Sequence, residues 1–309
     1  MTLHDRRSFL AALGASLGAV ACVASGVRSS DTAGGTTAAA AGGAAPNDSA
    51  SRAVAGATHG TLGPIGVQLY SVRDEMKKDV AATLARIARI GYKEVEFAGY
   101  FDRTPQQIRA MLDSNGLTAP SSHLQTPILG DQWMATLDAA KVIGHEYVVV
   151  PWFDKAKWRT LDDVKRTAAQ FNQAATDAKK AGLRFAYHNH DFEFTPIEGR
   201  MPYDVLLEST DPSLVLMEMD LYWATKAGQD PLTYFARYPG RFQMVHVKDA
   251  KNDAARTMTE VGSGVIDWKH ILGDRARAGI RHYFVEHDQP ADPFASVEAS
   301  YRYLSALTV

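Results

Sequence analysis

From Gly63 to the end of the chain, short apolar runs alternate with helix-forming stretches, and this alternation is the strongest constraint on the fold. The apolar runs are nearly continuous, which is typical of parallel strands covered on both faces. The eight runs are residues 64–71, 92–99, 117–124, 146–153, 183–194, 214–223, 242–250 and 281–289.

The stretches that follow these runs have helical spacing of apolar residues. They are residues 79–91, 104–116, 131–144, 160–182, 202–209, 230–239, 267–279 and 293–307. Thr104 and Pro105 are the expected N-cap and first helical residue of the second stretch. Eight strand–helix units predict an α/β fold, a (β/α)8 TIM barrel, over residues 63–309. A doubly wound open sheet is the alternative, but residues 68–79 lack the glycine-rich first turn common in that fold.

The first 62 residues have a different composition. Arg6 and Arg7 precede an apolar run of small residues, and residues 1–25 resemble a twin-arginine signal peptide. The run is too weak in hydrophobicity for a lasting transmembrane helix. Residues 26–62 are rich in Gly, Ala, Ser and Thr and predict a flexible linker. We therefore expect a protein exported to the periplasm by the twin-arginine route.

The only cysteine is Cys22, which excludes an internal disulfide and a zinc site built on thiolates. Residues 19–21 fit a signal-peptidase site and also loosely fit a lipoprotein box. Cleavage alone, and lipidation that would anchor Cys22 to a membrane, both stay open. The net charge of −2 gives no basic footprint for nucleic acid. The oligomeric state is open, a homo-oligomer included.

In a barrel of this kind, active sites lie at the C-terminal ends of the strands. Ionisable side chains gather at those ends: Glu94, Glu96, His123, His188, His190, Asp191, Glu218, Asp220, His246, Lys248, Asp249, Glu286, His287 and Asp288. The opposite ends carry Arg184, Arg241, Arg281 and His282, which we expect to be solvated. So many buried charges are costly unless they are paired or bind a cation. We predict one divalent metal ion, and the nitrogen and oxygen donors fit Mn²⁺, Zn²⁺, Co²⁺ or Mg²⁺.

Asp220, His246 and Glu286 come from three successive strands at equivalent positions, so they are the firmest ligand candidates. Alternation puts His188 and His190 on one face if their strand continues to residue 190. If the strand ends at 188, only His188 faces inward.

Several neighbours have two interpretations. A lone histidine such as His123 is more often structural than functional. Glu218 alternates with Asp220, so it faces inward with it or pairs with an arginine. Lys248 beside Asp249 is compatible with a surface salt bridge.

The motifs VEFAG, YHNHDFEF, MEMDLYW, VHVKDA, VGSGVIDW and FVEHD, in this order, resemble the sugar phosphate isomerase/epimerase superfamily. This is the xylose isomerase-like barrel group, related in fold to endonuclease IV and to ketose 3-epimerases. The resemblance covers residues 63–309. It implies one divalent metal held by Glu, Asp, His and Glu from strands five to eight.

Carried over to this chain, the resemblance implies His188, Asp220, His246 and Glu286 as ligands, with His188 in place of a glutamate. Two metal-bound glutamates work on opposite faces of the substrate in ketose epimerases, and here only Glu286 remains as a clear base.

The resemblance leaves supporting roles to other side chains of the same strand ends. His190 or Lys248 would transfer the second proton, and Glu96 and His123 would hold hydroxyls. Trp223 and Tyr70 would offer flat apolar faces to a sugar ring.

We therefore expect a metal-dependent isomerase or epimerase that moves a proton next to the carbonyl of a sugar or keto-sugar. The QLYSVRD opening and the export signal also resemble secreted barrel proteins that break down 3-keto-sugars. A 3-keto-glycoside lyase that eliminates the aglycone at the same metal site is the alternative. A non-catalytic sugar-binding barrel is an alternative of another class.

Overall fold

The computed structural model describes residues 60–309. The expected signal peptide, Cys22 and the linker up to residue 59 lie outside the described residues. Gly60 exchanges two backbone hydrogen bonds with Val309, at 3.0 and 3.1 Å, and Leu62 is buried in the core. Residues 60–62, which we expected in the linker, are therefore part of the folded unit.

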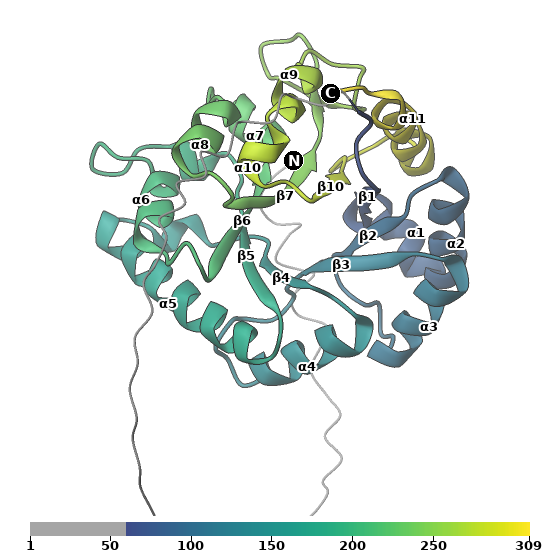
Figure 1. Ribbon diagram of the computed structural model, residues 1–309, viewed down its shortest axis with the longest axis horizontal. Coiled ribbons are helices and arrows are strands. Elements are labelled where there is room, and N and C mark those ends of the chain that lie inside the picture. The colour runs from purple at the N-terminus through teal and green to yellow at the C-terminus, as the bar shows by residue number, and fades with distance from the viewer. Residues whose placement is uncertain (1–59) are drawn as a thin grey trace, which may run out of the picture. The chain divides into compact units, whose positions relative to one another are not determined.

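Eight parallel strands close into a barrel, which confirms the predicted fold class. Around the barrel they follow the order β1-β10-β7-β6-β5-β4-β3-β2 (Figure 1). Their bounds are β1 Ile65–Gln68, β2 Glu94–Phe97, β3 Thr118–His123, β4 Tyr147–Val150, β5 Arg184–His188, β6 Val215–Asp220, β7 Phe242–Val247 and β10 His282–Val285. The remaining two strands, β8 Asp249–Ala250 and β9 Met258–Thr259, form a small antiparallel sheet after β7.

The helices surround this barrel on its outside (Figure 1). They are α1 Arg73–Lys78, α2 Val80–Ile90, α3 Pro105–Asn115, α4 Trp133–Ile143, α5 Leu161–Lys180, α6 Pro202–Ser209, α7 Leu221–Lys226, α8 Pro231–Arg237, α9 Trp268–Gly273, α10 Arg275–Ala278 and α11 Pro293–Ala306. Within residues 60–309, short 3₁₀ turns are η2 Leu69–Val72, η3 Lys155–Lys157 and η4 Phe192–Phe194. Thr104 caps α3 through a reciprocal hydrogen bond with Gln107, and Pro105 is the first residue of α3, as predicted.

Two hydrophobic layers hold the barrel together. The larger one lies between the strands and the outer helices, as expected for a sheet that is buried on both faces. The smaller one, which we call the inner apolar layer, consists of Tyr147, Val149, Ala186, Leu216, Met244 and Phe284. Gly66 on β1 leaves room for Phe284, since a Cβ at this glycine would lie 2.6 Å from the phenyl ring.

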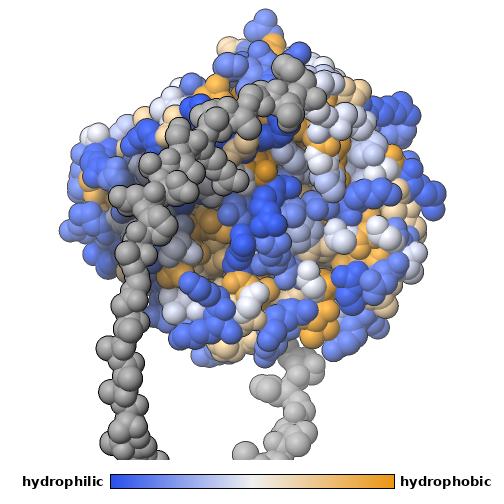
Figure 2. Space-filling model, in the orientation of Figure 1, coloured by the Kyte–Doolittle hydropathy of each residue, from blue (hydrophilic) through white to orange (hydrophobic). Residues whose placement is uncertain are grey.

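The outer surface is mixed in polarity. Hydrophilic residues dominate the rim of the face shown in Figure 2, and apolar residues form smaller separate areas between them. Among residues 60–309, no helix has both the length and the apolar character needed to cross a bilayer.

The N-terminal ends of the strands differ from the expectation in part. Arg184 and Arg281 are exposed, as expected, but His282 and Arg241 are buried. His282 Nδ1 lies 2.9 Å from Glu94 Oε2, and this glutamate is the first residue of β2 rather than one at its C-terminal end. Arg241 donates to the carbonyl of Leu207 and the hydroxyl of Thr210. Partners inside the fold therefore replace part of the solvation that we expected for these two side chains.

Candidate metal centre and active site

The polar residues inside the barrel follow from the alternation of its strands. Ala186, Leu216, Met244 and Phe284 belong to the inner apolar layer. Two residues further along the same strands come His188, Glu218, His246 and Glu286. Because side chains two apart share a face of a strand, these four groups lie one layer closer to the C-terminal end, where the sequence predicts the site.

Strand β5 ends at His188, and this decides between the two interpretations of the YHNHD stretch. His188 is buried and pairs in register with Glu218 of β6. His190 lies in the following loop, where its backbone N–H donates to Glu193 at 2.9 Å. Its ring packs between those of His188 and Trp223, at centroid distances of 5.1 and 5.9 Å. His190 is thus beside the cluster but not on the strand.

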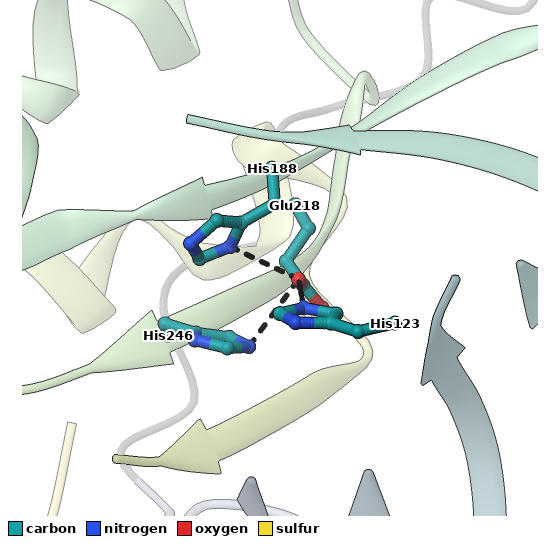
Figure 3. A group of neighbouring side chains, drawn as sticks. All are labelled: His123, His188, Glu218 and His246. Carbon is teal, nitrogen blue, oxygen red and sulfur yellow. Dashed lines mark hydrogen bonds and ion pairs between the residues drawn. The ribbon is translucent and has the colours of Figure 1, made fainter. Parts of the chain in front are cut away.

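Three imidazoles surround one carboxylate oxygen, Oε2 of Glu218 (Figure 3). The nearest nitrogens of His123, His188 and His246 lie at 2.7, 3.1 and 3.3 Å from it. The four side chains come from β3, β5, β6 and β7, and all are buried. We call His123, His188, Glu218 and His246 the inner group.

A second group of donors shares His246 with the inner group and includes Asp220 and Glu286. His246 Nδ1 lies 2.7 Å from Glu286 Oε2, and His188 Nε2 lies 3.6 Å from Asp220 Oδ2. We call His188, Asp220, His246 and Glu286 the outer group, and they are the four ligands that the resemblance implies. They come from β5, β6, β7 and the residue after β10, which are neighbours around the barrel.

The backbone of the next helix fixes the orientation of Asp220. This residue is the N-cap of α7, and its Oδ1 accepts the backbone N–H of Trp223 at 3.0 Å. A residue in this position satisfies one of the free N–H groups of the helix. The other oxygen, Oδ2, is left to face the site.

Lys248 follows β7 and is buried, which rules out the surface salt bridge with Asp249. Its ammonium lies 2.9 Å from Asp220 Oδ2, 2.5 Å from Glu286 Oε2 and 2.9 Å from Asp288 Oδ1. One buried cation therefore pairs with three carboxylates.

Asp249 has a structural role. Its carboxylate accepts the backbone N–H groups of Gly262 and Ile266 and the indole N–H of Trp268. It thereby holds the VGSGVIDW segment against β8.

Burial and neighbouring charges shift the pKa values of these groups in different directions. Burial lowers the pKa of His188 to about 3, so its imidazole is neutral and has a lone pair to offer. Burial raises the pKa of Asp220 to about 6, against the effect of Lys248. Burial opposes ionisation of Glu286 as well, but Lys248 and His246 hold its pKa well below the usual range.

The four predicted substrate-binding residues do not lie together: two are buried beneath the outer group, one lies near Lys248, and one lies in the turn after β1. His123 and Glu96 are both buried beneath the outer group, and Glu96 Oε2 lies 2.7 Å from His246 Nε2. The ring of Trp223 lies 5.9 Å from the Lys248 ammonium. Tyr70 lies in the turn after β1, and the guanidinium of Arg73 covers its ring at 4.1 Å. One face of Tyr70 is therefore already occupied.

The sequence did not identify Glu218 as a site residue, and it left open whether this side chain faces inward or pairs with an arginine. The structure decides for the inward position. Gln68 is a further member that was missed, and it donates to Glu96 Oε2 at 2.8 Å. No local signal marks Gln68, because its role depends on a partner 28 residues away.

The comparison with protein families matches residues 84–306 to the xylose isomerase-like TIM barrel. The chain belongs to this family. Inosose dehydratase from Lacticaseibacillus casei is 25% identical over 256 residues, which cover 70% of this chain and 85% of the relative. A sugar phosphate isomerase/epimerase from Parabacteroides distasonis is 30% identical, with a TM-score of 0.70 over 79% of this chain and 98% of that one. The relatives are sugar isomerases or epimerases and dehydratases, and this family member is an enzyme of that group.

A solved IolI protein with a bound zinc atom has the same fold, with 11% identity and a TM-score of 0.61 over 78% of this chain and 96% of that one. In the present chain, the buried His and Glu cluster is consistent with a divalent metal site. The donors are imidazole nitrogens and carboxylate oxygens, which suit Zn²⁺, Mn²⁺ and Co²⁺. In the outer group, the imidazole of His188 is neutral, and its Nε2 and Asp220 Oδ2 face each other at 3.6 Å without a hydrogen bond. The residues present therefore fit a bound cation.

Proposed function

We propose that the chain is a divalent-metal-dependent enzyme that moves a proton next to the carbonyl of a sugar or keto-sugar, as an isomerase or epimerase does. The observation that carries the proposal is the outer group. Two imidazoles and two carboxylates from neighbouring strands meet at the end of the barrel where substrates bind in this fold.

His188, Asp220, His246 and Glu286 would hold the ion. When bound, a divalent cation would polarise a carbonyl oxygen and make the adjacent C–H more acidic. Glu286 is ionised at neutral pH, so it can accept that proton. Lys248 lies 2.5 Å from Glu286 and can donate a proton or hold a substrate hydroxyl. Trp223 and His190 line the same corner and supply flat surfaces for a sugar ring.

The second candidate is a lyase that removes the group β to the carbonyl, such as the aglycone of a 3-keto-glycoside. It is favoured by His188, which stands where the epimerases have a second glutamate. Elimination needs one base to take the proton from carbon and one acid to protonate the leaving oxygen. The C–H and C–O bonds break, and a C=C bond forms. Glu286 and Lys248 could fill these two roles, and the inosose dehydratase relatives act by name as dehydratases.

The two reactions can be distinguished by their products in heavy water. Purified protein is stripped of metal, reloaded with Mn²⁺, Zn²⁺, Co²⁺ or Mg²⁺, and incubated with a ketose, a 3-keto-glucoside and their phosphorylated forms. Deuterium at the carbon next to the carbonyl with an intact glycoside supports the isomerase or epimerase. Release of aglycone with no epimer supports the lyase. A wild-type protein that binds no divalent ion, or one that binds it and exchanges no proton, overturns the proposal.

We further propose export by the twin-arginine route, on the strength of Arg6, Arg7 and the apolar run after them. The test is a paired R6K/R7K variant, which should stay in the cytoplasm while the wild type reaches the periplasm. Cys22→Ala tests lipidation. If the wild type is lipidated, it is found in the membrane fraction and the variant is not. Periplasmic wild type unaffected by R6K/R7K would overturn the route.

A further inference from the structure

A second polar layer lies directly beneath the outer group. Its acceptors are Glu96 and Glu218, and both are fully buried. Glu96 Oε2 lies 2.7 Å from His246 Nε2, and Glu96 Oε1 accepts the hydroxyl of Ser121 at 2.7 Å. Glu218 Oε2 lies 3.1 Å from His188 Nδ1. Glu96 therefore contacts the back of His246, and Glu218 contacts the back of His188 and also lies 3.3 Å from His246 Nε2.

The two nitrogens of each ring face opposite layers. His246 Nε2 and His188 Nδ1 face the glutamates beneath, whereas His246 Nδ1 and His188 Nε2 lie beside Glu286 and Asp220. With an ion at the outer group, the nitrogens on the outer side would hold it, and the nitrogens on the inner side would keep their protons and donate to the carboxylates.

His123 joins the two glutamates. Its Nε2 lies 2.7 Å from Glu218 Oε2 and 3.3 Å from Glu96 Oε2, and its ring stacks on that of His246 at 5.2 Å. This contact holds the two carboxylates of the layer at a fixed separation.

We infer that Glu96 and Glu218 are positioning residues for the metal-binding histidines His246 and His188. Each glutamate holds the orientation of its ring and, with the ion bound, would keep the ring proton on the nitrogen away from the ion. His123 contacts both glutamates and holds them in place. This inference rests on the proposed function, because it presumes the ion at the outer group. A carboxylate behind a ligand histidine raises its basicity, and losing one typically weakens metal binding roughly 10- to 100-fold.

The rival is that the inner group itself holds an ion. The distances argue against it, because three nitrogens converge on Glu218 Oε2 at 2.7, 3.1 and 3.3 Å. These are the separations of hydrogen bonds and ion pairs to that oxygen, so the oxygen itself stands at the centre of the group. The two arrangements differ in their need for Asp220, which belongs to the outer group and not to the inner group.

The chain offers a matched control at the other end of the barrel. Glu94 lies on the same strand as Glu96, two residues earlier, and also pairs with a buried histidine, His282. Glu94→Gln changes the same kind of pair without touching the outer group. Glu96→Gln and Glu218→Gln keep the size of the side chain, so they are the test variants.

The experiment measures Zn²⁺ and Co²⁺ affinity of the folded, metal-stripped chain by competition with a chelator. Absorption spectra of the Co²⁺ forms and long-range ¹H–¹⁵N spectra of the Zn²⁺ form report the ligand field and the protonated nitrogens. We expect one ion per chain, roughly 10- to 100-fold weaker binding and altered spectra for both test variants. Glu94→Gln should bind as the wild type does.

Wild-type affinity and spectra in both test variants would overturn the inference. Two ions per chain, one of them lost in Glu218→Gln, would overturn it in favour of the rival, and so would one ion per chain that Asp220→Asn binds as tightly as the wild type does. If Glu218→Gln does not fold, Glu96→Gln decides alone, since it acts through His246 from another strand. A wild type that binds no ion is a different result, because it refutes the proposed function itself.

Discussion

The two ends of the barrel interior contain the same kind of contact with different outcomes. At the N-terminal end, Glu94 pairs with His282, whose ring lies between those of Tyr147 and Phe284. At the C-terminal end, which we call the upper end, both ring nitrogens of His246 contact glutamates. Nε2 lies 2.7 Å from Glu96 and Nδ1 lies 2.7 Å from Glu286. The inner apolar layer separates the two ends.

The difference lies in the balance of donors and acceptors. At the N-terminal end, which we call the lower end, Glu94 and His282 form the lower pair, with one histidine for one carboxylate. The upper end stacks two layers of carboxylates with imidazoles between them and adds the Lys248 ammonium. Buried charges cost several kcal/mol each unless they are compensated. An end that brings so many together is consistent with the further cation that we propose, whereas the lower end has a single pair that links two strands.

The largest expected effect comes from removing one carboxylate of the upper end. Asp220→Asn keeps an oxygen to cap α7 but replaces the oxygen that faces the site. We expect metal affinity to fall by more than roughly 100-fold, beyond the loss of a group that only orients a ligand, and turnover to be lost. Metal content after dialysis and deuterium exchange measure both.

The matched control is Asp230→Asn, which makes the same change at the exposed N-cap of α8. It should bind metal and turn over as the wild type does. Equal metal content in Asp220→Asn and Asp230→Asn would show that the two ends do not differ in the way described.

Next in size is the internal cation. Lys248→Met keeps the length of the side chain but leaves three carboxylates without their partner. Breaking a buried pair in this way costs about 3–5 kcal/mol, so the metal-free variant should unfold at much lower denaturant concentration. Saturating Zn²⁺ should recover more stability in the variant than in the wild type. Equal recovery would mean that the lysine and the ion do not neutralise the same carboxylates.

The lower pair should matter for stability alone. Glu94→Gln replaces a charged acceptor of His282 with a neutral one, and we expect a loss of about 1–3 kcal/mol in the free energy of unfolding. Denaturant titration measures the loss, and chelator competition measures metal binding. Reduced metal affinity in this variant would contradict the separation of the two ends.

The smallest effect concerns a histidine without any carboxylate partner. His145 is buried, with Nδ1 2.6 Å from the carbonyl of Ala119 and Nε2 3.0 Å from the hydroxyl of Tyr100. Burial lowers its pKa to about 4, whereas the glutamates around His246 raise the pKa of that ring against the effect of burial. Carboxylate contact therefore separates the two kinds of buried histidine.

The sign of the pH effect follows from proton binding. Below pH 6.5 the unfolded chain binds a proton at His145 that the native state excludes, so stability falls as the pH falls towards 4. Between pH 7 and 6 this amounts to roughly 0.5–1 kcal/mol. His145→Asn keeps a donor for Ala119 and should remove this part of the pH dependence in denaturant titrations. An unchanged difference between the two pH values would show that the pKa of His145 is the same in the native and unfolded states.

The fold was predictable from the sequence because each strand–helix unit carries a local signal. Apolar runs, N-caps such as Thr104 and helix-closing glycines act over a few residues, and their eightfold repetition leaves few ways to assemble. The same reasoning brought Asp220, His246 and Glu286 to one end, since the C-terminal ends of parallel strands must share an edge.

The tertiary structure alone decided how these side chains are layered. Glu218 becomes the centre of three imidazoles, Lys248 is buried among three carboxylates, and Glu94 belongs to the lower end. These contacts join residues up to 188 positions apart in the sequence. Alternation along one strand specifies which face a side chain occupies, but its partners depend on how each strand is staggered against its neighbours when the barrel closes.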